Sequence, residues 1–309
     1  MKIVFMGTPQ FAANILKALY EAGHEIRYAV CQPDKASGRG HKVQAPPVKE
    51  TAAGFGIEVL QPVKVKGNAE FLETIQACRP DMIIVAAYGR ILPKELLEVP
   101  EHGCVNVHAS LLPKLRGASP IPMSIVTGEE KTGVSIMRMD EGLDTGGVYA
   151  SAETVIGRRH CPELTEELSV MGADLLVKTI PGIADGSITA QEQDDSLATF
   201  TGMIGKKDGL IDFHKSPHEI DCMIRGYDPW PGAFTYLGGE TLKIWEAEPL
   251  DEANGYAPGT VTAAGSGGIA VAAGGSTLLL KVIQVPGKKR MEVREYLKGH
   301  SVELFTVLG

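Results

Sequence analysis

The N-terminal part of the chain alternates short apolar runs with amphipathic stretches, a pattern typical of strands and helices that follow one another. Residues 2–6 are apolar and end at a glycine turn, after which Phe11, Ile15, Leu16 and Leu19 recur at helical spacing. A second apolar run covers 26–31, so the chain begins as a β-α-β unit. Further strands are predicted at 58–60, 81–87, 132–139 and 148–156, and helices at 48–55, 69–78 and 164–183. The alternation predicts an α/β domain with a doubly wound, mostly parallel sheet.

The pattern changes in the C-terminal third. Short strand-like runs are separated there by glycine or proline turns, at 234–236, 242–247, 259–263, 269–272, 277–285 and 301–308. This spacing predicts a small β-barrel similar to oligonucleotide-binding folds, with one helix at 216–226 for which Ser216 is the N-cap. A polar stretch without a clear period lies between the two patterns. We therefore predict a first domain at 1–188, a linker at 189–206 and a second domain at 207–309.

The stretch from Cys104 to Pro113 contains the first candidate chemistry. Asn106 and His108 alternate with valines, and a strand places alternate residues on one face. The strand ends at Leu111-Leu112-Pro113, so both polar side chains lie near its exit. A side-chain amide and an imidazole together can stabilise developing charge and transfer protons. An ordinary polar strand edge would give the same triplet.

Ligands in open α/β sheets bind beyond the carboxyl ends of the strands. The loop after the buried run 81–87, which includes Tyr88 and Gly89, is therefore expected at the same edge as the exit of the strand that carries Asn106 and His108. Residues 140–147 contain three acids and three glycines, which indicates a tight polar turn. Asp144 in this turn could orient an imidazole and raise its pKa, although by itself it fits an ordinary turn residue.

Composition narrows the class of protein. The 309 residues, 44% hydrophobic and 22% charged, are typical of a globular chain of two domains. The five cysteines are scattered and include no C-x-x-C pair, which favours reduced thiols in a cytoplasm and no structural zinc. No apolar run approaches the roughly 20 residues that span a bilayer. The net charge of −8 argues against a nonspecific nucleic-acid coat protein but allows local basic patches.

Two basic clusters stand out on this acidic chain. The long loop at 32–48 carries Lys35, Arg39, His41 and Lys42, and the end of the chain carries Lys281, Lys288, Lys289, Arg290, Arg294 and Lys298. Each would ordinarily be a solvated surface. Together they favour a phosphate-bearing partner.

Several motifs in order along the chain resemble the methionyl-tRNA formyltransferase family. The strongest are NVHASLLPKLRGASPI at 106–121, MDEGLDTGG at 139–147 and FMGTPQFA near the start; QPDKASGRG, AAYGRILP, DPWPGAF and PGKKRMEVREYLKGH support them. The resemblance covers nearly the whole chain. It implies a Rossmann-like formyltransferase domain and transfer of a formyl group from 10-formyltetrahydrofolate to the amine of methionyl initiator tRNA. It further implies a cytoplasmic monomer that needs no metal and no membrane.

The resemblance assigns roles residue by residue. Asn106, His108 and Asp144 match the catalytic trio of the family, and Ser110, Leu111, Leu112 and Pro113 match its folate-binding segment. Tyr88 and Gly89 are further candidates for the folate site. The candidates for tRNA contact are Arg39, Lys42, Lys288, Lys289 and Arg290. The chain departs from the family pattern at Leu115, Ser119 and Thr201-Gly202-Met203, which puts the linker geometry and the detail of the binding site in question, not the activity.

Three other functions remain open at this stage. A folate-dependent formyltransferase acting on a sugar-nucleotide amine or on glycinamide ribonucleotide would share the trio, but would need neither basic cluster. A tRNA-binding protein without catalysis would not need the trio. A dehydrogenase is disfavoured because Gly7 lacks the other glycines of G-x-G-x-x-G. Phe11 is a candidate for the methionine pocket.

Overall fold

The computed structural model describes residues 1–37 and 42–309, and these form two compact units. The N-terminal unit comprises 1–120, 131–155 and 165–202, and the C-terminal unit comprises 121–130, 156–164 and 203–309. The chain therefore crosses between the units more than once, whereas the predicted division at 188 and 206 is strictly sequential. The two short segments 121–130 and 156–164 account for the difference.

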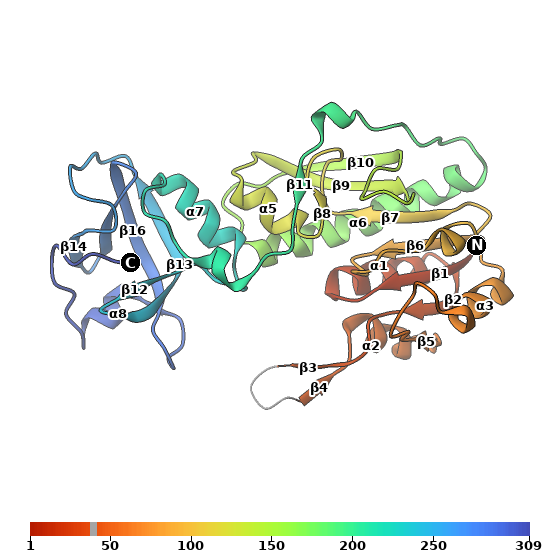
Figure 1. The fold of residues 1–309 in the computed structure, drawn as a ribbon, viewed down its shortest axis with the longest axis horizontal. Helices are drawn as coiled ribbons and strands as arrows, with labels where there is room; N and C mark the ends of the chain where they lie inside the picture. The colour runs from red at the N-terminus through yellow and green to blue at the C-terminus, as the bar shows by residue number, and fades with distance from the viewer. Residues whose placement is uncertain (38–41) are drawn as a thin grey trace. The chain divides into compact units, whose positions relative to one another are not determined.

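The N-terminal unit is built on a seven-stranded sheet in the order β10-β9-β7-β6-β1-β2-β5 (Figure 1). Its strands are β1 (Lys2–Gly7), β2 (Glu25–Val30), β5 (Val59–Leu60), β6 (Met82–Ala86), β7 (Cys104–His108), β9 (Lys131–Arg138) and β10 (Val148–Val155). The pairs from β5 to β7 are parallel, while β9 and β10 are antiparallel to their neighbours. The predicted doubly wound, mostly parallel sheet is confirmed.

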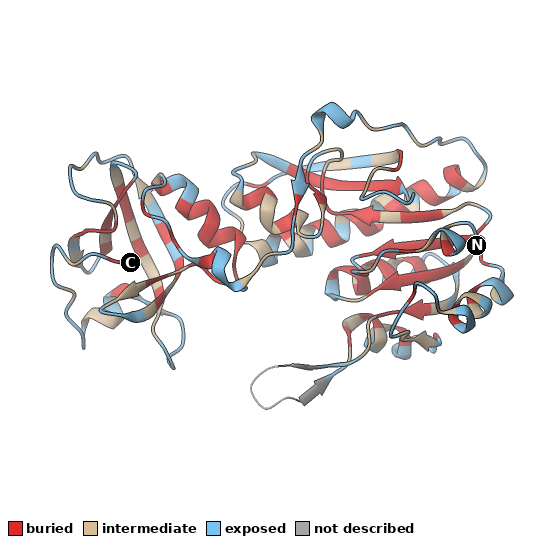
Figure 2. Ribbon diagram, viewed as in Figure 1, coloured by how far each residue is buried: buried red, intermediate tan, exposed pale blue. Residues whose placement is uncertain are grey.

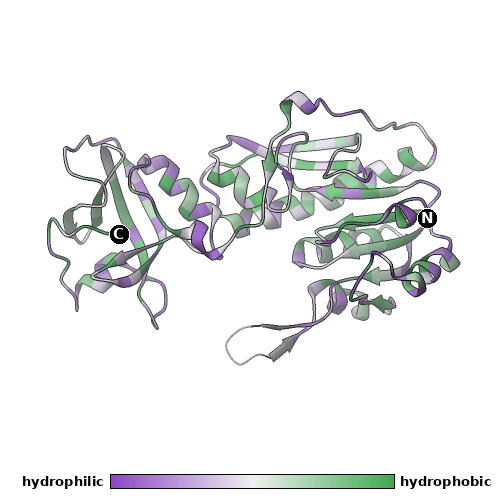
Figure 3. Cartoon of the chain, in the orientation of Figure 1, coloured by the Kyte–Doolittle hydropathy of each residue, from purple (hydrophilic) through white to green (hydrophobic). Residues whose placement is uncertain are grey.

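The central strands are continuous apolar runs because both faces of the sheet are covered. Residues 3–7 of β1 and all five residues of β6 are buried, and Figure 2 shows these strands in red. The same strands are among the more hydrophobic parts of the chain in Figure 3. On one face α6 (Cys161–Ala184) packs closely on β7 and β9, since a Cβ added at Gly172 would lie 2.9 Å from Val107 Cγ1. This contact supports the strand that carries Asn106 and His108.

The other helices before β9 are α1 (Gln10–Glu21), α2 (Pro47–Gly54), α3 (Ala69–Cys78), α4 (Lys94–Leu97) and α5 (Pro120–Val126). The first three lie in the predicted helical stretches, whereas the short α4 was not predicted. Phe11, Ile15, Leu16 and Leu19 of α1 are all buried, as the spacing requires. Asn68 caps α3 by accepting a hydrogen bond from Phe71 N at 3.1 Å.

Two stretches predicted as irregular contain short strands. The loop at 32–48 includes β3 (Lys35–Ser37) and β4 (Lys42–Gln44), which pair antiparallel. The polar stretch after α6 contains two 3-10 turns, η1 (Asp195–Leu197) and η2 (Lys206–Gly209), and the strand β11 (Phe200–Thr201). β11 pairs in parallel with β8 (Arg116–Gly117), just beyond β7, as Figure 1 shows. The stretch predicted as a linker is therefore part of the N-terminal unit up to residue 202.

The C-terminal unit is a curled antiparallel sheet. Its strands are β12 (Phe234–Leu237), β13 (Glu240–Leu250), β14 (Val261–Gly265), β15 (Gly268–Ala273), β16 (Ser276–Gln284) and β17 (Met291–Glu292). The order is β12-β13-β16-β15-β14, with β17 also paired to β16. It is a half-barrel, because no pairing joins the edge strands β12 and β14 among the described residues. The predicted strand at 301–308 is reduced to an isolated bridge between Thr260 and Val307.

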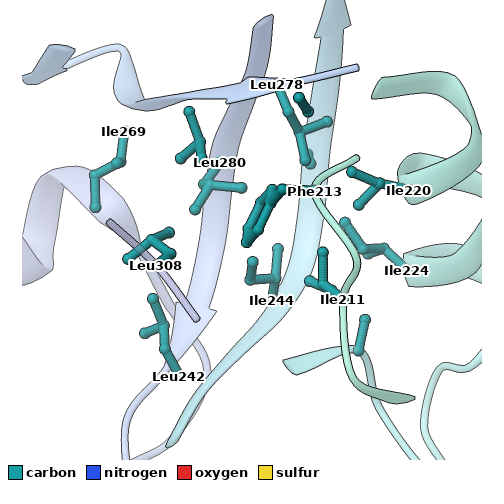
Figure 4. Packing of buried hydrophobic residues seen from close by; sticks show 14 of the residues in the cluster. Ile211, Phe213, Ile220, Ile224, Leu242, Ile244, Ile269, Leu278, Leu280 and Leu308 are labelled. Carbon is teal, nitrogen blue, oxygen red and sulfur yellow. The ribbon is translucent and has the colours of Figure 1, made fainter. Parts of the chain in front are cut away.

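A single hydrophobic core fills this unit. α7 (Pro217–Gly226) lies across the sheet, and its Ile220 and Ile224 point toward Phe213 and strands β13 and β16 in Figure 4. Ser216 is the N-cap of α7, as predicted, and its Oγ accepts a hydrogen bond from Glu219 N at 3.2 Å. The short α8 (Val293–Leu297) contributes Val293 to the same core.

No helix in the described part of the chain is both long enough and apolar enough to cross a membrane.

Candidate active site

Strand β7 presents Asn106 and His108 at the carboxyl edge of the sheet. Val85 of β6 is the parallel partner of Asn106, so the exits of β6 and β7 lie at the same edge, as expected. Val105 and Val107, which alternate with the two polar residues, are buried, and Val107 pairs with Ile136 of β9. Alternation places Asn106 and His108 on the opposite face of the strand from these valines.

The amide of Asn106 keeps most of its capacity to donate hydrogen bonds. The side chain is half-buried, and its Nδ2 donates to Met137 Sδ at 3.9 Å. A thioether is a weak acceptor, so a carbonyl oxygen would compete for this donor easily. A donor of this kind fits a reaction in which negative charge develops on a carbonyl oxygen.

His108 is buried and held from both sides of its ring. Its Nε2 lies 3.1 Å from the carbonyl oxygen of Leu115, and its Nδ1 lies 3.7 Å from Asp144 Oδ2. Because a carbonyl only accepts, Nε2 carries a proton, and the lone pair of the neutral ring is on Nδ1. The 3.7 Å separation is too long for a direct hydrogen bond and suits one mediated by water or by a bound amine.

Burial lowers the pKa of His108 below its ordinary value of 6.5. The negative charge of Asp144 and the hydrogen bond to the Leu115 carbonyl both raise this pKa, but they offset the effect of burial only in part. The imidazole is therefore neutral at pH 7. A neutral ring with a free Nδ1 lone pair can accept a proton during a reaction.

Asp144 sits in a tight turn between β9 and β10. Its backbone has a φ of 54°, a left-handed conformation that aspartate tolerates better than most residues. Its Oδ2 accepts a hydrogen bond from Gly117 N at 2.8 Å, and its side chain is 17% exposed. The structure therefore brings the three predicted catalytic residues together: Asn106 and His108 share one face of β7, and Asp144 lies next to His108.

The loop that follows β7 is fastened by β11. Leu115 N donates to Thr199 Oγ1 at 2.9 Å, and Arg116 N donates to Thr199 O at 2.9 Å. A Cβ at Gly117 would lie 2.2 Å from Thr201 O, so only glycine permits this approach. Thr199, just before β11, and Thr201 within it thus hold the loop that offers its Leu115 carbonyl to His108. Sequence reasoning missed them, because a two-residue strand has no periodicity.

The candidate folate segment is fixed to β9 through Ser135. Ser135 Oγ donates to Ser110 O at 2.8 Å and accepts from Leu112 N at 3.2 Å. Ser110 is buried, and its Oγ donates to Lys114 O at 2.6 Å. Its side chain is therefore occupied, and the exposed surface of the segment comes from Leu111, Leu112 and Pro113, which are half-buried.

Tyr88 and Gly89 lie beyond the end of β6. Tyr88 is 2% exposed and belongs to an apolar cluster with Val85 and Leu92, and its hydroxyl has no hydrogen-bond partner among the described residues. Burial raises the pKa of Tyr88 to about 12. Gly89 has a φ of 75°, and the Tyr88 carbonyl accepts from Gln32 Nε2 at 3.0 Å. The backbone, rather than the phenol, is what this segment can offer to a ligand.

The candidate tRNA-binding residues differ in whether their side chains already contact other protein groups. Arg39 lies outside the described residues, as does the side chain of Lys42. Lys288 and Lys289 are exposed in the turn between β16 and β17. Arg290 instead pairs with Asp228, with Nη2 at 2.7 Å from Oδ1, and its guanidinium lies 3.5 Å from the centre of the Trp245 ring. Arg290 therefore has a structural role within the C-terminal unit, which its place in a basic run of the sequence could not reveal.

No group of three or more metal-binding side chains is assembled within the described ranges, 1–37 and 42–309.

Family models cover both units of the chain. The formyl transferase model matches residues 1–180, and the formyl transferase C-terminal domain model matches residues 203–301. Curated relatives align over the full length: the methionyl-tRNA formyltransferase of Bacillus subtilis (strain 168) is 46% identical over 100% of this chain and 98% of its own. That of Acetivibrio thermocellus is 45% identical over 100% of both chains.

Solved structures with lower identity share the fold. The N-formyltransferase from Helicobacter canadensis, crystallised with folinic acid and dTDP-3-aminofucose, is 18% identical with a TM-score of 0.69, over 91% of this chain and 98% of that one. The methionyl-tRNA formyltransferase from Clostridium thermocellum is 19% identical with a TM-score of 0.55, over 81% and 94%. HypX from Aquifex aeolicus, in complex with tetrahydrofolic acid, is 16% identical with a TM-score of 0.62; this chain spans about half of it, 47%.

These matches agree with the geometry of the site. Full-length identity of 45–46% to curated formyltransferases excludes the dehydrogenase alternative. The chain belongs to the methionyl-tRNA formyltransferase family.

Proposed function

We propose that this protein transfers the formyl group of 10-formyltetrahydrofolate to the α-amino group of methionyl initiator tRNA. The observation that carries the proposal is the placement of Asp144 beside His108, which shares a strand with Asn106, in a chain that matches this family over its full length. The match of residues 1–180 to the formyl transferase model further supports a tetrahydrofolate-derived donor.

Asn106 stabilises the charge that develops on the formyl oxygen when the amine attacks. Its Nδ2 donor has only a thioether as its partner in the structure, so little is lost when it turns to a carbonyl oxygen. The donor lies on rigid β7 between two paired strands, which supports preorganisation of the amide.

His108 and Asp144 carry out the proton transfers of the reaction. The attacking amine must lose a proton, and the Nδ1 lone pair of neutral His108, 3.7 Å from Asp144 Oδ2, is suited to receive it. Asp144 stabilises the imidazolium that results, and the ring can then protonate the leaving N10 nitrogen. The hydrogen bond from Nε2 to Leu115 O keeps the ring oriented through these steps.

The acceptor is a tRNA rather than a small amine because basic groups are concentrated on an otherwise acidic chain. Lys288 and Lys289 are exposed in the C-terminal unit, and Arg39 and Lys42 belong to the loop of which 38–41 lie outside the described residues. A sugar nucleotide or glycinamide ribonucleotide would not need these clusters. We further propose that the enzyme acts as a monomer in the cytoplasm, where charged initiator tRNA is found.

The decisive experiment supplies the purified protein with 10-formyltetrahydrofolate and methionyl initiator tRNA and measures formylmethionyl-tRNA. Parallel reactions use glycinamide ribonucleotide, a dTDP-amino sugar or uncharged tRNA as the acceptor. We expect product only with methionyl-tRNA. Formylation of either small amine in its place would overturn the proposal, and so would no turnover with any acceptor.

A further inference from the structure

Arg116, just beyond the loop that contacts His108, is a buried cation. It is 2% exposed, and its guanidinium donates to Gln193 Oε1 from Nε at 3.1 Å and from Nη2 at 2.9 Å. Nη2 also donates to Asp195 Oδ1 at 2.7 Å, although the Asp195 side chain is 80% exposed. A buried charge must be paired or hydrogen-bonded, so these partners are needed to keep Arg116 in place.

The other end of the Gln193 amide holds the turn that carries Asp144. Its Nε2 donates to Asp144 O at 2.8 Å and to Gly146 O at 2.7 Å. The orientation of the amide is unambiguous, because a guanidinium only donates and a carbonyl only accepts. Both ends of the amide are thus used, with the oxygen on Arg116 and the nitrogen on the turn.

This amide connects the two segments that flank the imidazole of His108. The loop after β7 provides the Leu115 carbonyl to Nε2, and the turn after β9 provides the Asp144 carboxylate to Nδ1. The left-handed backbone of Asp144 is a conformation that its surroundings must maintain. Gln193 supplies two of the hydrogen bonds that maintain it, and the bond from Gly117 N to Asp144 Oδ2 is a third.

We propose that Gln193 is a positioning residue for formyl transfer: it sets the placement of Asp144 relative to His108 without touching the substrate. The proposal rests on the proposed function for its effect on turnover. Displacement of a catalytic group by about 1 Å typically costs on the order of 10²-fold in rate. Loss of the amide should therefore lower kcat, with little change in KM for the tRNA.

Two substitutions separate the two ends of the amide. Gln193→Met removes both sets of hydrogen bonds at similar length, whereas Gln193→Glu keeps an acceptor for Arg116 and removes the donors to the turn. Gln191→Met is the matched control, because Gln191 is two residues away and exposed, and its amide contacts only Thr189, at 3.3 Å. Steady-state formylation gives kcat and KM, and thermal unfolding gives the folded fraction.

We expect both Gln193 variants to lose about 10- to 100-fold in kcat per folded molecule, with KM for the tRNA within about twofold and the control unchanged. Wild-type kcat in both variants would refute the proposal, as would a loss that the unfolded fraction accounts for entirely.

A second readout does not depend on the substrate. An NMR titration of the His108 ring should show a lower pKa in Gln193→Met than in the native protein, because Asp144 raises that pKa and would no longer be held beside the ring. An unchanged His108 pKa would overturn the positioning role. If the native protein does not formylate methionyl-tRNA, the proposed function fails, while the titration still tests whether Gln193 positions Asp144.

Discussion

His108 is the central residue of the candidate site, because both nitrogens of its imidazole face protein groups. Leu115 O fixes the proton on Nε2, and Asp144 faces the opposite nitrogen at 3.7 Å. Asn106, two residues earlier on the same strand, offers a hydrogen-bond donor. Under the proposed function, one short strand thus supplies both charge stabilisation and acid–base chemistry.

Replacing Asn106 with alanine removes the donor to the formyl oxygen. Loss of one donor of this type costs about 10²–10³ in kcat. We expect the variant to fold normally, because the side chain is half-buried and its partner is only the Met137 thioether. Single-turnover formylation with saturating tRNA measures the effect. A variant that keeps more than half of the native kcat would show that Asn106 is not the oxyanion donor.

The His108 pKa provides a second test at this scale. In the native protein it should titrate below 6.5, and in Asp144→Asn lower still, because the carboxylate that raises the pKa is gone. The unfolded chain takes up this proton near pH 6.5. The contribution of neutral His108 to stability is therefore complete above pH 6.5 and is lost as the pH falls toward the folded-state pKa. A native value above 6.5 by NMR titration would contradict this reading.

The sequence named candidate catalytic residues but not their contacts. Period-2 alternation placed Asn106 and His108 on one face, whereas Asp144 was named by the family resemblance, since the turn pattern alone fitted an ordinary turn residue. The contact of His108 with Leu115 could not be foreseen, because it depends on the left-handed backbone at Leu115, with a φ of 58°, and on a hydrogen bond to Thr199 far along the chain. Local patterns carry no information on such distant pairings.

At the scale of elements, strong periodicity and clear caps made prediction reliable. The buried strands β1, β6 and β7 and the helices α1 and α3 lie where apolar spacing placed them. The short strands β3, β4, β8 and β11 were missed, since two or three residues form no recognisable pattern. The strand expected at 301–308 is wrong: backbone hydrogen bonds join this segment to residues 259–261, but its pairing there is a bridge at Val307 and does not extend into a strand.

The N-cap of α7 yields a prediction at this scale. Ser216 and Glu219 form a reciprocal capping box, in which Glu219 Oε2 accepts from Ser216 N at 3.0 Å. Ser216→Ala should destabilise the C-terminal unit by about 1 kcal/mol. Both tryptophans, Trp230 and Trp245, lie in that unit, so fluorescence-detected urea unfolding reports on it directly. Ser301→Ala, at an exposed loop serine, is the control, and equal midpoints for the two variants would contradict the capping role.

At the scale of the whole molecule, the net charge of −8 and the exposed basic residues have opposite effects on the binding of a polyanion. Long-range repulsion from the acidic surface must be overcome by close contacts between lysine or arginine side chains and phosphates. Such contacts weaken with salt, whereas binding of the folate does not depend on them.

Neutralising Lys288 and Lys289 together should therefore weaken tRNA use selectively. We expect Lys288→Ala/Lys289→Ala to raise KM for methionyl-tRNA, and to reduce the slope of log K against log salt by about one for each phosphate that the lysines no longer neutralise. KM for the folate should remain native. Arg294→Ala, whose guanidinium already pairs with Glu292, is the control. An unchanged salt dependence in the double variant would remove these lysines from the tRNA surface.

The pairing of β11 with β8 has a consequence for how such proteins can be recombined. The first family model ends at residue 180, whereas Gln193, Thr199 and Thr201, which fasten the loop around His108, all follow that point. In a chimera joined at residue 180, the sheet would come from one parent. Gln193, Thr199 and Thr201, which hold the loop after β7 and the turn of Asp144, would come from the other. A junction after Gly202 would keep β7 and the residues that hold its loop from the same parent.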